Sequence, residues 1–203
     1  MKIVAATQNK GKLGELRGIT EKYGLELVSM AEAGLADLDI PENGTSFAEN
    51  SLQKAKTVSE LCDLPAIADD SGLCVDYLGG EPGVYSARYA GVHGDDALNR
   101  AKILRVMAGV PKEQRKASFH CCITLYFPGG KHISAEGVSV GEIAEKELGE
   151  GGFGYDKVFI PEGYDISYAQ IGVEQKNKMS HRAKALAQLE EYLKEAGLDE
   201  ENE

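Results

Sequence analysis

The chain has 203 residues, of which 42 % are hydrophobic and 27 % are charged, which is ordinary for a globular protein. These values exclude disorder, collagen and coiled coil for the whole chain, and the length fits one domain or at most two small lobes. The net charge of −11 at pH 7 argues against general nucleic-acid binding, which needs a basic face, and against an anionic membrane surface. A small anionic ligand would need a local cluster of basic side chains or backbone N–H groups.

The cysteines and the first residues indicate the compartment. The chain has four cysteines and no C-x-x-C motif: Cys62, Cys74, Cys121 and Cys122. We expect reduced thiols. The apolar run at the N-terminus is too short for a signal peptide, and no run reaches the roughly 20 apolar residues of a membrane helix. We therefore expect a cytoplasmic protein.

The first part of the chain alternates strands and helices. An apolar run over 3–6 predicts a buried strand, and the polar turn 7–12 leads into a helix over 13–23. A short strand over 25–28 precedes an acidic, turn-rich loop over 30–46. This alternation is typical of parallel strand pairing.

The middle of the chain continues the pattern. An amphipathic helix over 48–61 is followed by an apolar strand over 65–68, which is expected to stop at Asp69. Several glycines and a proline interrupt the segment 79–94, which predicts a structured loop, and a helix over 95–107 comes next.

The last part adds antiparallel elements. Strands over 119–127 and 132–140, joined by a Pro-Gly-Gly turn, predict a β-hairpin. A glycine-rich loop over 149–156, a short strand over 158–160 and a closing helix over 181–196 follow. Parallel and antiparallel elements together predict an α/β protein with a mixed sheet.

The turn 7–12 is the first candidate site. Strand-to-helix turns point backbone N–H groups at anions, and Lys10 and Lys12 add positive charge. Thr7 and Asn9 add hydrogen-bonding groups. A helix-start loop with solvated lysines explains the turn equally well, and the Walker A pattern is absent.

Carboxylates form the second candidate. Asp69, Asp70 and Ser71 follow the apolar strand, and Glu42 lies in the acidic loop. Oxygen ligands of this kind suit Mg²⁺. Successive side chains on an extended segment point in opposite directions, so Asp69 and Asp70 should have different roles. An ordinary Asp-rich turn is the alternative, but the preceding apolar run favours a functional strand end.

Three further segments carry candidate residues. Asn50 and Lys54 share a face of the helix over 48–61, for which a solvated surface is the favoured interpretation. Phe153 lies between glycines and could stack on a base or fill a tight turn. Ser180 is a plausible N-cap, which places His181 and Arg182 where positive charge opposes the helix dipole and favours a role in ligand binding. The basic residues that could gather in one cleft are Lys10, Lys12, Lys54, Lys176 and Arg182.

In this order the motifs resemble the ITPase family, the inosine/xanthosine triphosphate pyrophosphatases. The matching segments are TQNKGK (7–12), ENGTSFAENSLQKA (42–55), PAIADDSGLCVDYLGGEPGVYSARYAG (65–91), GGFGYD (151–156) and SHRAKAL (180–186). The resemblance implies Mg²⁺-dependent hydrolysis of ITP, dITP and XTP to the monophosphate and pyrophosphate, which keeps deaminated purine nucleotides out of DNA and RNA. It also implies a homodimer and a single catalytic domain over 1–203, with two lobes around a long mixed sheet and the active site in a central cleft.

The resemblance assigns roles residue by residue. Asp70 would be the catalytic carboxylate and, with Glu42, a metal ligand. The substrate would be bound by Thr7, Gln8, Asn9, Lys10, Gly11, Lys12, Lys54, Ser71, Phe153, Gly154, Tyr155, Asp156, Lys176, His181 and Arg182. The turn 7–12 would cradle the triphosphate and Phe153 would stack on the base, while the His-Arg pair would favour a 6-keto purine over adenine.

Two positions depart from the family pattern, and two other functions remain open. Gln8 replaces the glycine of T-G-N, and Lys157 replaces the proline of G-Y-D-P. A side chain at position 8 could alter the approach of the backbone to phosphates. A Maf-like pyrophosphatase acting on dTTP or UTP and a non-catalytic nucleotide sensor are the alternatives. A Ser-His hydrolase is disfavoured because G-x-S-x-G is absent.

Overall fold

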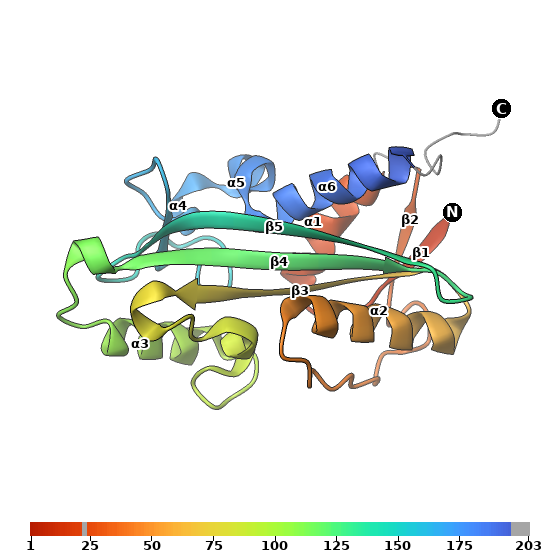
Figure 1. Cartoon of the computed structure of the whole chain (residues 1–203), viewed down its shortest axis with the longest axis horizontal. Coiled ribbons are helices and arrows are strands. Elements are labelled where there is room, and N and C mark those ends of the chain that lie inside the picture. The colour runs from red at the N-terminus through yellow and green to blue at the C-terminus, as the bar shows by residue number, and fades with distance from the viewer. Residues whose placement is uncertain (22–23, 196–203) are drawn as a thin grey trace. The chain divides into compact units, whose positions relative to one another are not determined.

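The computed structural model describes residues 1–21 and 24–195 (Figure 1). The chain divides into two compact units. The first contains Met1–Asp70, Cys121–Gly137 and the chain from Ala185 onward, and the second contains Ser71–His120 and Val138–Lys184. The division falls inside three strands and one helix, so both units draw on several distant parts of the sequence.

Six strands form one sheet in the order β2-β1-β3-β4-β5-β6. They are β1 (Lys2–Ala5), β2 (Glu26–Ser29), β3 (Ala66–Val75), β4 (Lys116–Tyr126), β5 (His132–Ile143) and β6 (Phe159–Pro161). Strand β1 is parallel to β2 and β3, whereas β5 and β6 are antiparallel. The prediction of an α/β protein with a mixed sheet is confirmed.

The helices flank these strands. They are α1 (Lys10–Thr20), α2 (Phe47–Cys62), α3 (Asp96–Val106), α4 (Tyr168–Ile171), α5 (Val173–Met179) and α6 (His181–Glu195). Short 3-10 helices cover Asp76–Leu78, Gly83–Arg88 and Lys112–Gln114. The predicted long helices are confirmed within the described residues, with positions 22, 23 and 196 lying outside them. The 3-10 helices and the short helices α4 and α5 were not predicted, because a few residues are too short to show a helical period.

Strand β3 contradicts the prediction that it stops at Asp69. It continues to Val75 through Asp69 and Asp70, and both carboxylates are buried. Asp69 forms an ion pair with Lys12, and Asp70 accepts a hydrogen bond from Asn50. Because these partners satisfy the side chains, strand pairing overrides the local preference for a turn.

The core of the first unit covers both faces of its strands. Ile3, Ala5 and Ile67 belong to one apolar cluster with α1 and α6 residues, while Val4 and Ala68 belong to a second cluster with α2 residues. This alternation is the period of two expected for strands.

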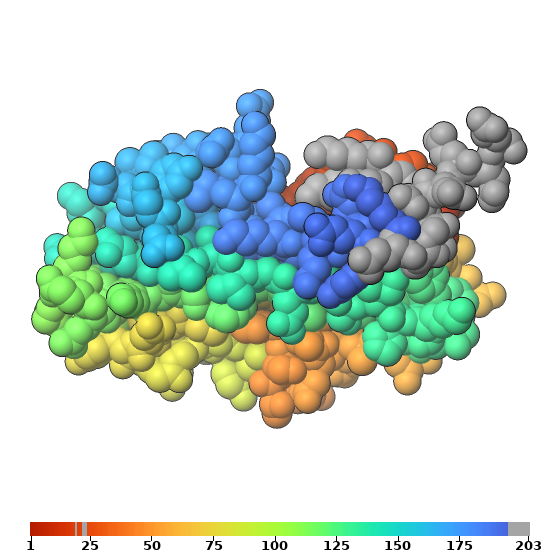
Figure 2. Space-filling model, turned by 45° about the horizontal axis from the view of Figure 1, so that its top comes forward, coloured from red at the N-terminus to blue at the C-terminus, as the bar shows by residue number. Residues whose placement is uncertain are grey.

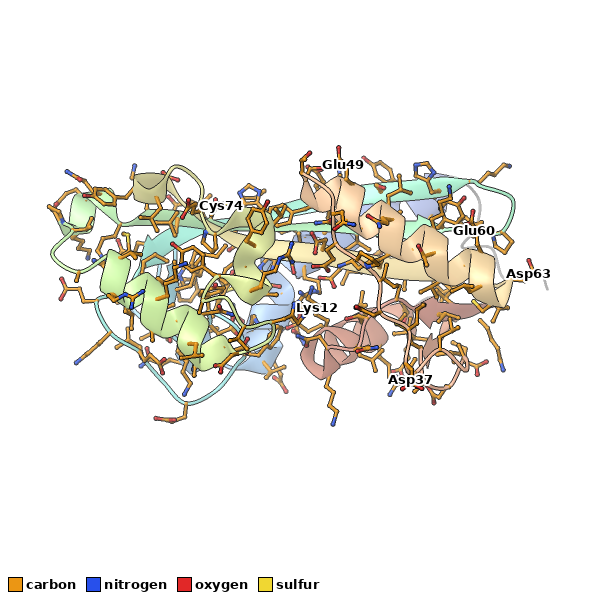
Figure 3. The ribbon with its side chains drawn as sticks, turned by 90° about the horizontal axis from the view of Figure 1, so that it is seen from below. Lys12, Asp37, Glu49, Glu60, Asp63 and Cys74 are labelled. Atoms are coloured by element: carbon orange, nitrogen blue, oxygen red, sulfur yellow. The ribbon has the colours of Figure 1, made fainter. Side chains whose placement is uncertain are left out.

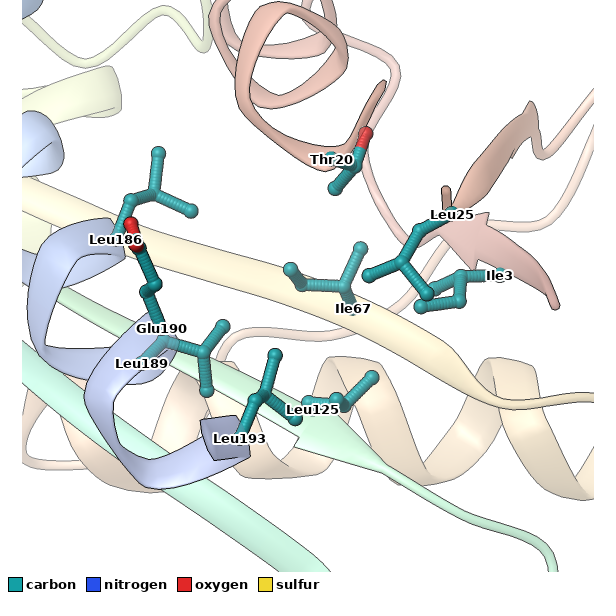
Figure 4. A pocket seen from close by; sticks show the side chains of 9 residues that line it. All are labelled: Ile3, Thr20, Leu25, Ile67, Leu125, Leu186, Leu189, Glu190 and Leu193. Carbon is teal, nitrogen blue, oxygen red and sulfur yellow. The ribbon is translucent and has the colours of Figure 1, made fainter. Parts of the chain in front are cut away.

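Helix α6 lies beside β5 (Figure 2). The Glu136 N–H of β5 donates to Gln188 Oε1 of α6 at 2.7 Å. The leucines of α6 point toward β3 and β4 across a small apolar pocket (Figure 4). The helix thus closes one side of the first unit's core.

The second unit has an aromatic core and a buried arginine. Phe119, Phe159 and Tyr168 pack together there, with ring centroids 4.7 to 6.1 Å apart. The Arg115 guanidinium donates to the carbonyls of Met107, Val110, Ile143 and Ala144. These bonds fix the end of α3 to β5. Among the described residues, no helix is long and apolar enough to cross a membrane.

Candidate functional site

A buried lysine joins two carboxylates in the first unit. The Nζ of Lys54 lies 2.7 Å from Oε1 of Glu42 and 3.1 Å from Oδ1 of Asp70. Helix α2 supplies the lysine, β3 supplies Asp70, and the loop over 30–46 supplies Glu42. Lys54 is only 8 % exposed. The prediction of a solvated surface for this helix face is therefore wrong, because the face packs toward β3.

Asn50, one turn before Lys54, fixes this arrangement. Its Nδ2 donates to Oδ2 of Asp70 at 3.0 Å, and its Oδ1 accepts the Gly44 N–H at 2.8 Å. A Cβ at Gly44 would lie 2.7 Å from Asn50 Oδ1 and 2.8 Å from Glu49 Cβ, so only glycine permits this close approach. Asn50 was given no separate role from the sequence, although its spacing of four from Lys54 was the available signal.

Burial and neighbouring charges shift the pKa values of Asp70 and Lys54. Burial raises the pKa of Asp70 above its ordinary value, although Lys54 and Lys12 oppose the shift. Burial alone would lower the pKa of Lys54, but the charges of Asp70 and Glu42 outweigh it and raise that pKa. Asp70 is therefore a stronger base than an exposed aspartate, next to an ammonium that stays charged.

Asp69 and Asp70 serve different partners. Lys12 Nζ lies 3.1 Å from Asp69 Oδ1, and the aspartate side chain is fully buried. The start of α1 carries this lysine (Figure 3), whereas Asp70 contacts residues of α2. Consecutive residues on a strand face opposite helices, so the expectation of different roles agrees with their contacts.

The turn 7–12 is organised by its own side chains. Asn9 Oδ1 accepts the N–H groups of Gly11 at 2.9 Å and Lys12 at 3.1 Å, which caps α1. Thr7 Oγ1 accepts the Asn9 N–H at 3.2 Å, and Lys10 is exposed. These bonds cap the helix start and occupy the N–H groups of Gly11 and Lys12.

Gln8 ties this turn to the acidic loop. Its Nε2 donates to the carbonyls of Ala36 and Leu38, both at 3.2 Å. The loop over 30–46 has no helix or strand, and it carries Glu42. The side chain that departs from the family pattern thus braces the segment that supplies one of the two carboxylates.

A second cluster, in the second unit, surrounds Phe153. Lys176 Nζ donates to Asp156 Oδ2 at 2.8 Å and lies 4.3 Å from the centroid of the Phe153 ring. The same Oδ2 accepts the Phe153 N–H at 3.0 Å. Gly152 has φ +74°, and a Cβ there would lie 2.7 Å from Asp156 Cβ. The loop therefore needs glycine at this position.

The start of α6 completes the second cluster. Ser180 Oγ accepts the Ala183 N–H at 3.2 Å, which confirms the predicted N-cap. The His181 ring stacks on Phe119 with centroids 4.7 Å apart and planes 11° apart. Arg182 is 2 % exposed and donates from Nη2 to Ser71 Oγ at 3.2 Å. Both basic residues are thus buried.

Gly154 and Tyr155 are held by other parts of the second unit. The Tyr155 hydroxyl donates to the Ser86 carbonyl at 2.8 Å, and burial raises its pKa. The Gly154 N–H donates to Asp96 Oδ2 at 2.7 Å, and its carbonyl accepts from Arg100 Nη1 at 2.9 Å. Neither Asp96 nor Arg100 stands out in the sequence, where only their i,i+4 spacing could have suggested them.

The expected basic residues fall into two groups. Lys12 and Lys54 lie with aspartates in the first unit, and Lys176 and Arg182 lie with Phe153 in the second. Asp70 and Ser71, which belong to different groups, are consecutive in β3. Within residues 1–21 and 24–195, no set of three or more His, Cys, Asp or Glu is arranged to hold a metal. Two carboxylates on one ammonium still fit Mg²⁺, which is often held by one or two carboxylates together with substrate phosphates.

The mixed sheet and its two buried clusters define an α/β protein with a lysine–carboxylate site and an aromatic–cation site. The model of the Ham1 family matches residues 3–192. The chain therefore belongs to the Ham1 family, and the resemblance drawn from its motifs is confirmed.

Individual relatives agree over nearly their full lengths. The dITP/XTP pyrophosphatase of Geobacillus kaustophilus is 48 % identical over 193 residues, covering 95 % of this chain and 94 % of that protein. The Ham1 protein structure of Staphylococcus aureus is 36 % identical with a TM-score of 0.85, covering 97 % of this chain and 100 % of that one. The Mycobacterium abscessus structure titled nucleoside-triphosphatase / dITP/XTP pyrophosphatase is 43 % identical with a TM-score of 0.76, covering 93 % and 98 %. The two structures have the same fold as this chain.

Proposed function

We propose that this chain is a nucleoside triphosphate pyrophosphatase that hydrolyses ITP, dITP and XTP to the nucleoside monophosphate and pyrophosphate. By doing so it removes deaminated purine nucleotides from the pool before they enter DNA or RNA. Its relatives carry the name dITP/XTP pyrophosphatase. The observation that carries the proposal is the buried Lys54 shared by Glu42 and Asp70, because phosphoryl chemistry needs cations and a base together.

Glu42 and Asp70 are the residues that would hold Mg²⁺. Their oxygens are the hard donors that this ion prefers, and substrate phosphates would complete its coordination. When bound, the ion supplies positive charge that neutralises phosphate oxygens. Lys54 already lies against both carboxylates, so it keeps them together before the ion binds.

Asp70 is proposed to accept the proton of the water that attacks phosphorus. Burial raises its pKa, which brings the carboxylate closer to the working pH of a general base. Asn50 engages one of its oxygens and Lys54 the other, so its orientation is set. Lys12, Lys54 and the turn 7–12 are proposed to bind the triphosphate.

The second cluster is proposed to bind the base. The half-buried Phe153 ring would stack on the purine, while Ser71, Lys176 and the loop 153–156 contact the nucleotide. His181 and Arg182 are proposed to read the 6-keto edge. Adenine would leave buried polar groups of this site without partners, and such mismatches discriminate strongly.

The same proposal covers the organisation of the chain. We expect residues 1–203 to act as a single catalytic domain, with two lobes, in a cytoplasmic homodimer. The relatives match over nearly their whole lengths, which supports one functional unit. Size-exclusion chromatography with light scattering would give the number of copies.

Pyrophosphate release tests the proposed function. The panel is ITP, dITP, XTP, GTP, ATP, dTTP and UTP, each with Mg²⁺ or with EDTA. We expect Mg²⁺-dependent release from the first three and little from ATP. Preference for dTTP or UTP would instead indicate a Maf-like enzyme. Tight ITP binding without release would indicate a nucleotide sensor and contradict the proposal.

A further inference from the structure

Side chains of helix α3 form hydrogen bonds with both the N–H and the carbonyl of Gly154, which follows Phe153 in the glycine-rich loop. Asp96 Oδ2 accepts the Gly154 N–H at 2.7 Å, and Arg100 Nη1 donates to the Gly154 carbonyl at 2.9 Å. The two side chains are four residues apart and therefore share a helix face. This face lies within the second unit, as does the loop.

The gripped residue has a backbone conformation that favours glycine. Gly154 has φ +58°, in the left-handed region that glycine enters readily, and a Cβ added there would meet nothing within 4 Å. No neighbouring atom packs against the residue on that side. The two charged side chains of α3 supply directional contacts to its backbone.

Arg100 also reaches the segment before the loop. Its Nε donates to Glu147 Oε1 at 2.7 Å, and the arginine side chain is 11 % exposed. One guanidinium thus fixes two points of the chain that flank Gly151 and Gly152, which have no side chains to anchor them. Charge-assisted bonds of this kind are stronger than neutral ones.

Phe153 lies between this grip and a second anchor. On its C-terminal side, the next residue is held by α3. Its own N–H is held by Asp156, which also accepts from Lys176. The ring itself is only half-buried and has Lys176 near its face. Hydrogen bonds from side chains therefore fix the backbone at Phe153 and at Gly154, and this constrains the direction in which the ring leaves the chain.

We propose that Asp96 and Arg100 are positioning residues that set the Phe153 ring for the base by gripping the backbone of Gly154. The inference rests on the proposed function, in which Phe153 stacks on a purine. Neither α3 side chain needs to touch the substrate. Loss of either should weaken nucleotide binding while the carboxylate cluster of the first unit continues to work.

The test compares Asp96→Ala and Arg100→Gln with a matched control on the same helix. Asp95 caps α3 by accepting the Leu98 N–H at 2.9 Å, and the Gly154 backbone bonds to the other two side chains instead. Asp95→Ala should lower the melting temperature and leave KM for ITP unchanged. Asp96→Ala and Arg100→Gln should raise KM about tenfold with kcat within about twofold, since tenfold corresponds to the loss of one good contact. Asp96→Asn keeps an acceptor and should restore most of the affinity.

A double-mutant cycle with Phe153→Leu separates positioning from a general loss of structure. If Asp96 acts through the ring, Asp96→Ala should have little further effect on KM once the ring is gone. Equal losses in both backgrounds would overturn the inference, as would an unchanged KM in Asp96→Ala. If the wild type releases no pyrophosphate, the proposed function fails, and ITP affinity by calorimetry then replaces KM in the same cycle.

Discussion

Two buried lysines, one in each unit, show how differently the same side chain can be used. Lys54 contacts two carboxylates, Glu42 and Asp70. Lys176 contacts the carboxylate of Asp156 and lies over the face of Phe153. They are 8 % and 5 % exposed, respectively, so burial does not distinguish them. Their partners do.

The surplus of negative charge suits the first cluster to a cation, whose coordination substrate phosphates would then complete. Two carboxylates around one ammonium leave a net charge that a further cation can balance. The Lys176–Asp156 pair is neutral, and the lysine adds a cation–π contact to the ring. That arrangement orients an aromatic platform. The first cluster should therefore determine turnover, and the second should determine affinity and choice of base.

The largest effect should come from Asp70→Asn. Loss of the proton acceptor should lower kcat for ITP by about 10³-fold, within the range of general-base contributions. Asp63→Asn is the matched control, because Asp63 is exposed and its φ of 53° suits asparagine equally well. Steady-state pyrophosphate release would measure both variants. Retention of more than a tenth of the activity would remove Asp70 from the role of base.

Lys54→Met should affect turnover and stability together. Two buried carboxylates would lose their shared ammonium, so we expect kcat to fall about 10²-fold and the free energy of unfolding to fall by about 3 kcal/mol. Mg²⁺ should raise the melting temperature of this variant more than that of the wild type. Lys56→Met, at an exposed ion pair with Glu60 at 3.9 Å, should change neither. An equal response to Mg²⁺ would argue against a metal at Glu42 and Asp70.

Lys176→Met should change affinity rather than turnover. Without the ammonium, Asp156 loses its counter-charge and Phe153 loses its cation–π contact, so KM for ITP should rise about tenfold, equal to about 1.4 kcal/mol. The preference for ITP over ATP should fall as well. Lys178→Met, at an exposed neighbour on α5, is the control. A fall in kcat with constant KM would contradict the assignment of turnover to the first cluster and of affinity to the second.

Gln8→Gly should have the smallest effect. It restores the glycine typical of the family and removes two hydrogen bonds to the loop that carries Glu42. We expect the Mg²⁺ concentration for half-maximal activity to rise about threefold, in line with the modest value of exposed hydrogen bonds. Gln8→Met keeps the side-chain length without the donor and should behave the same way. If Gln8→Met needs the same Mg²⁺ concentration as the wild type, the two hydrogen bonds of Gln8 do not cause the effect.

Periodicity predicted the long elements, because an amphipathic pattern is local. It failed at β3, where turn-forming aspartates are satisfied by Lys12 and Asn50. These partners come from other elements, and no local rule can supply them. The same limitation hid the burial of Lys54, since a polar helix face looks solvated until the strand that covers it is known.

The order of the motifs predicted most of the candidate site residues, but it did not predict the residues that support them. Asn50 contacts Asp70 across 20 positions, while Asp96 and Arg100 contact Gly154 across 58 and 54. Such pairs depend on the tertiary fold. A motif names the residues that meet the ligand, but the residues that hold them in place are visible only in three dimensions.

The alternation of side chains along β3 also determines which changes this segment can accept during evolution. Ile67 and Asp69 face the α1 side, while Ala68 and Asp70 face the α2 side. Inserting or deleting one residue between the β1-paired positions and Asp69 would exchange the two faces. Each aspartate would then face the helix that its neighbour now faces, and would lose its present partners. Related proteins should therefore accept substitutions in this segment but keep its length.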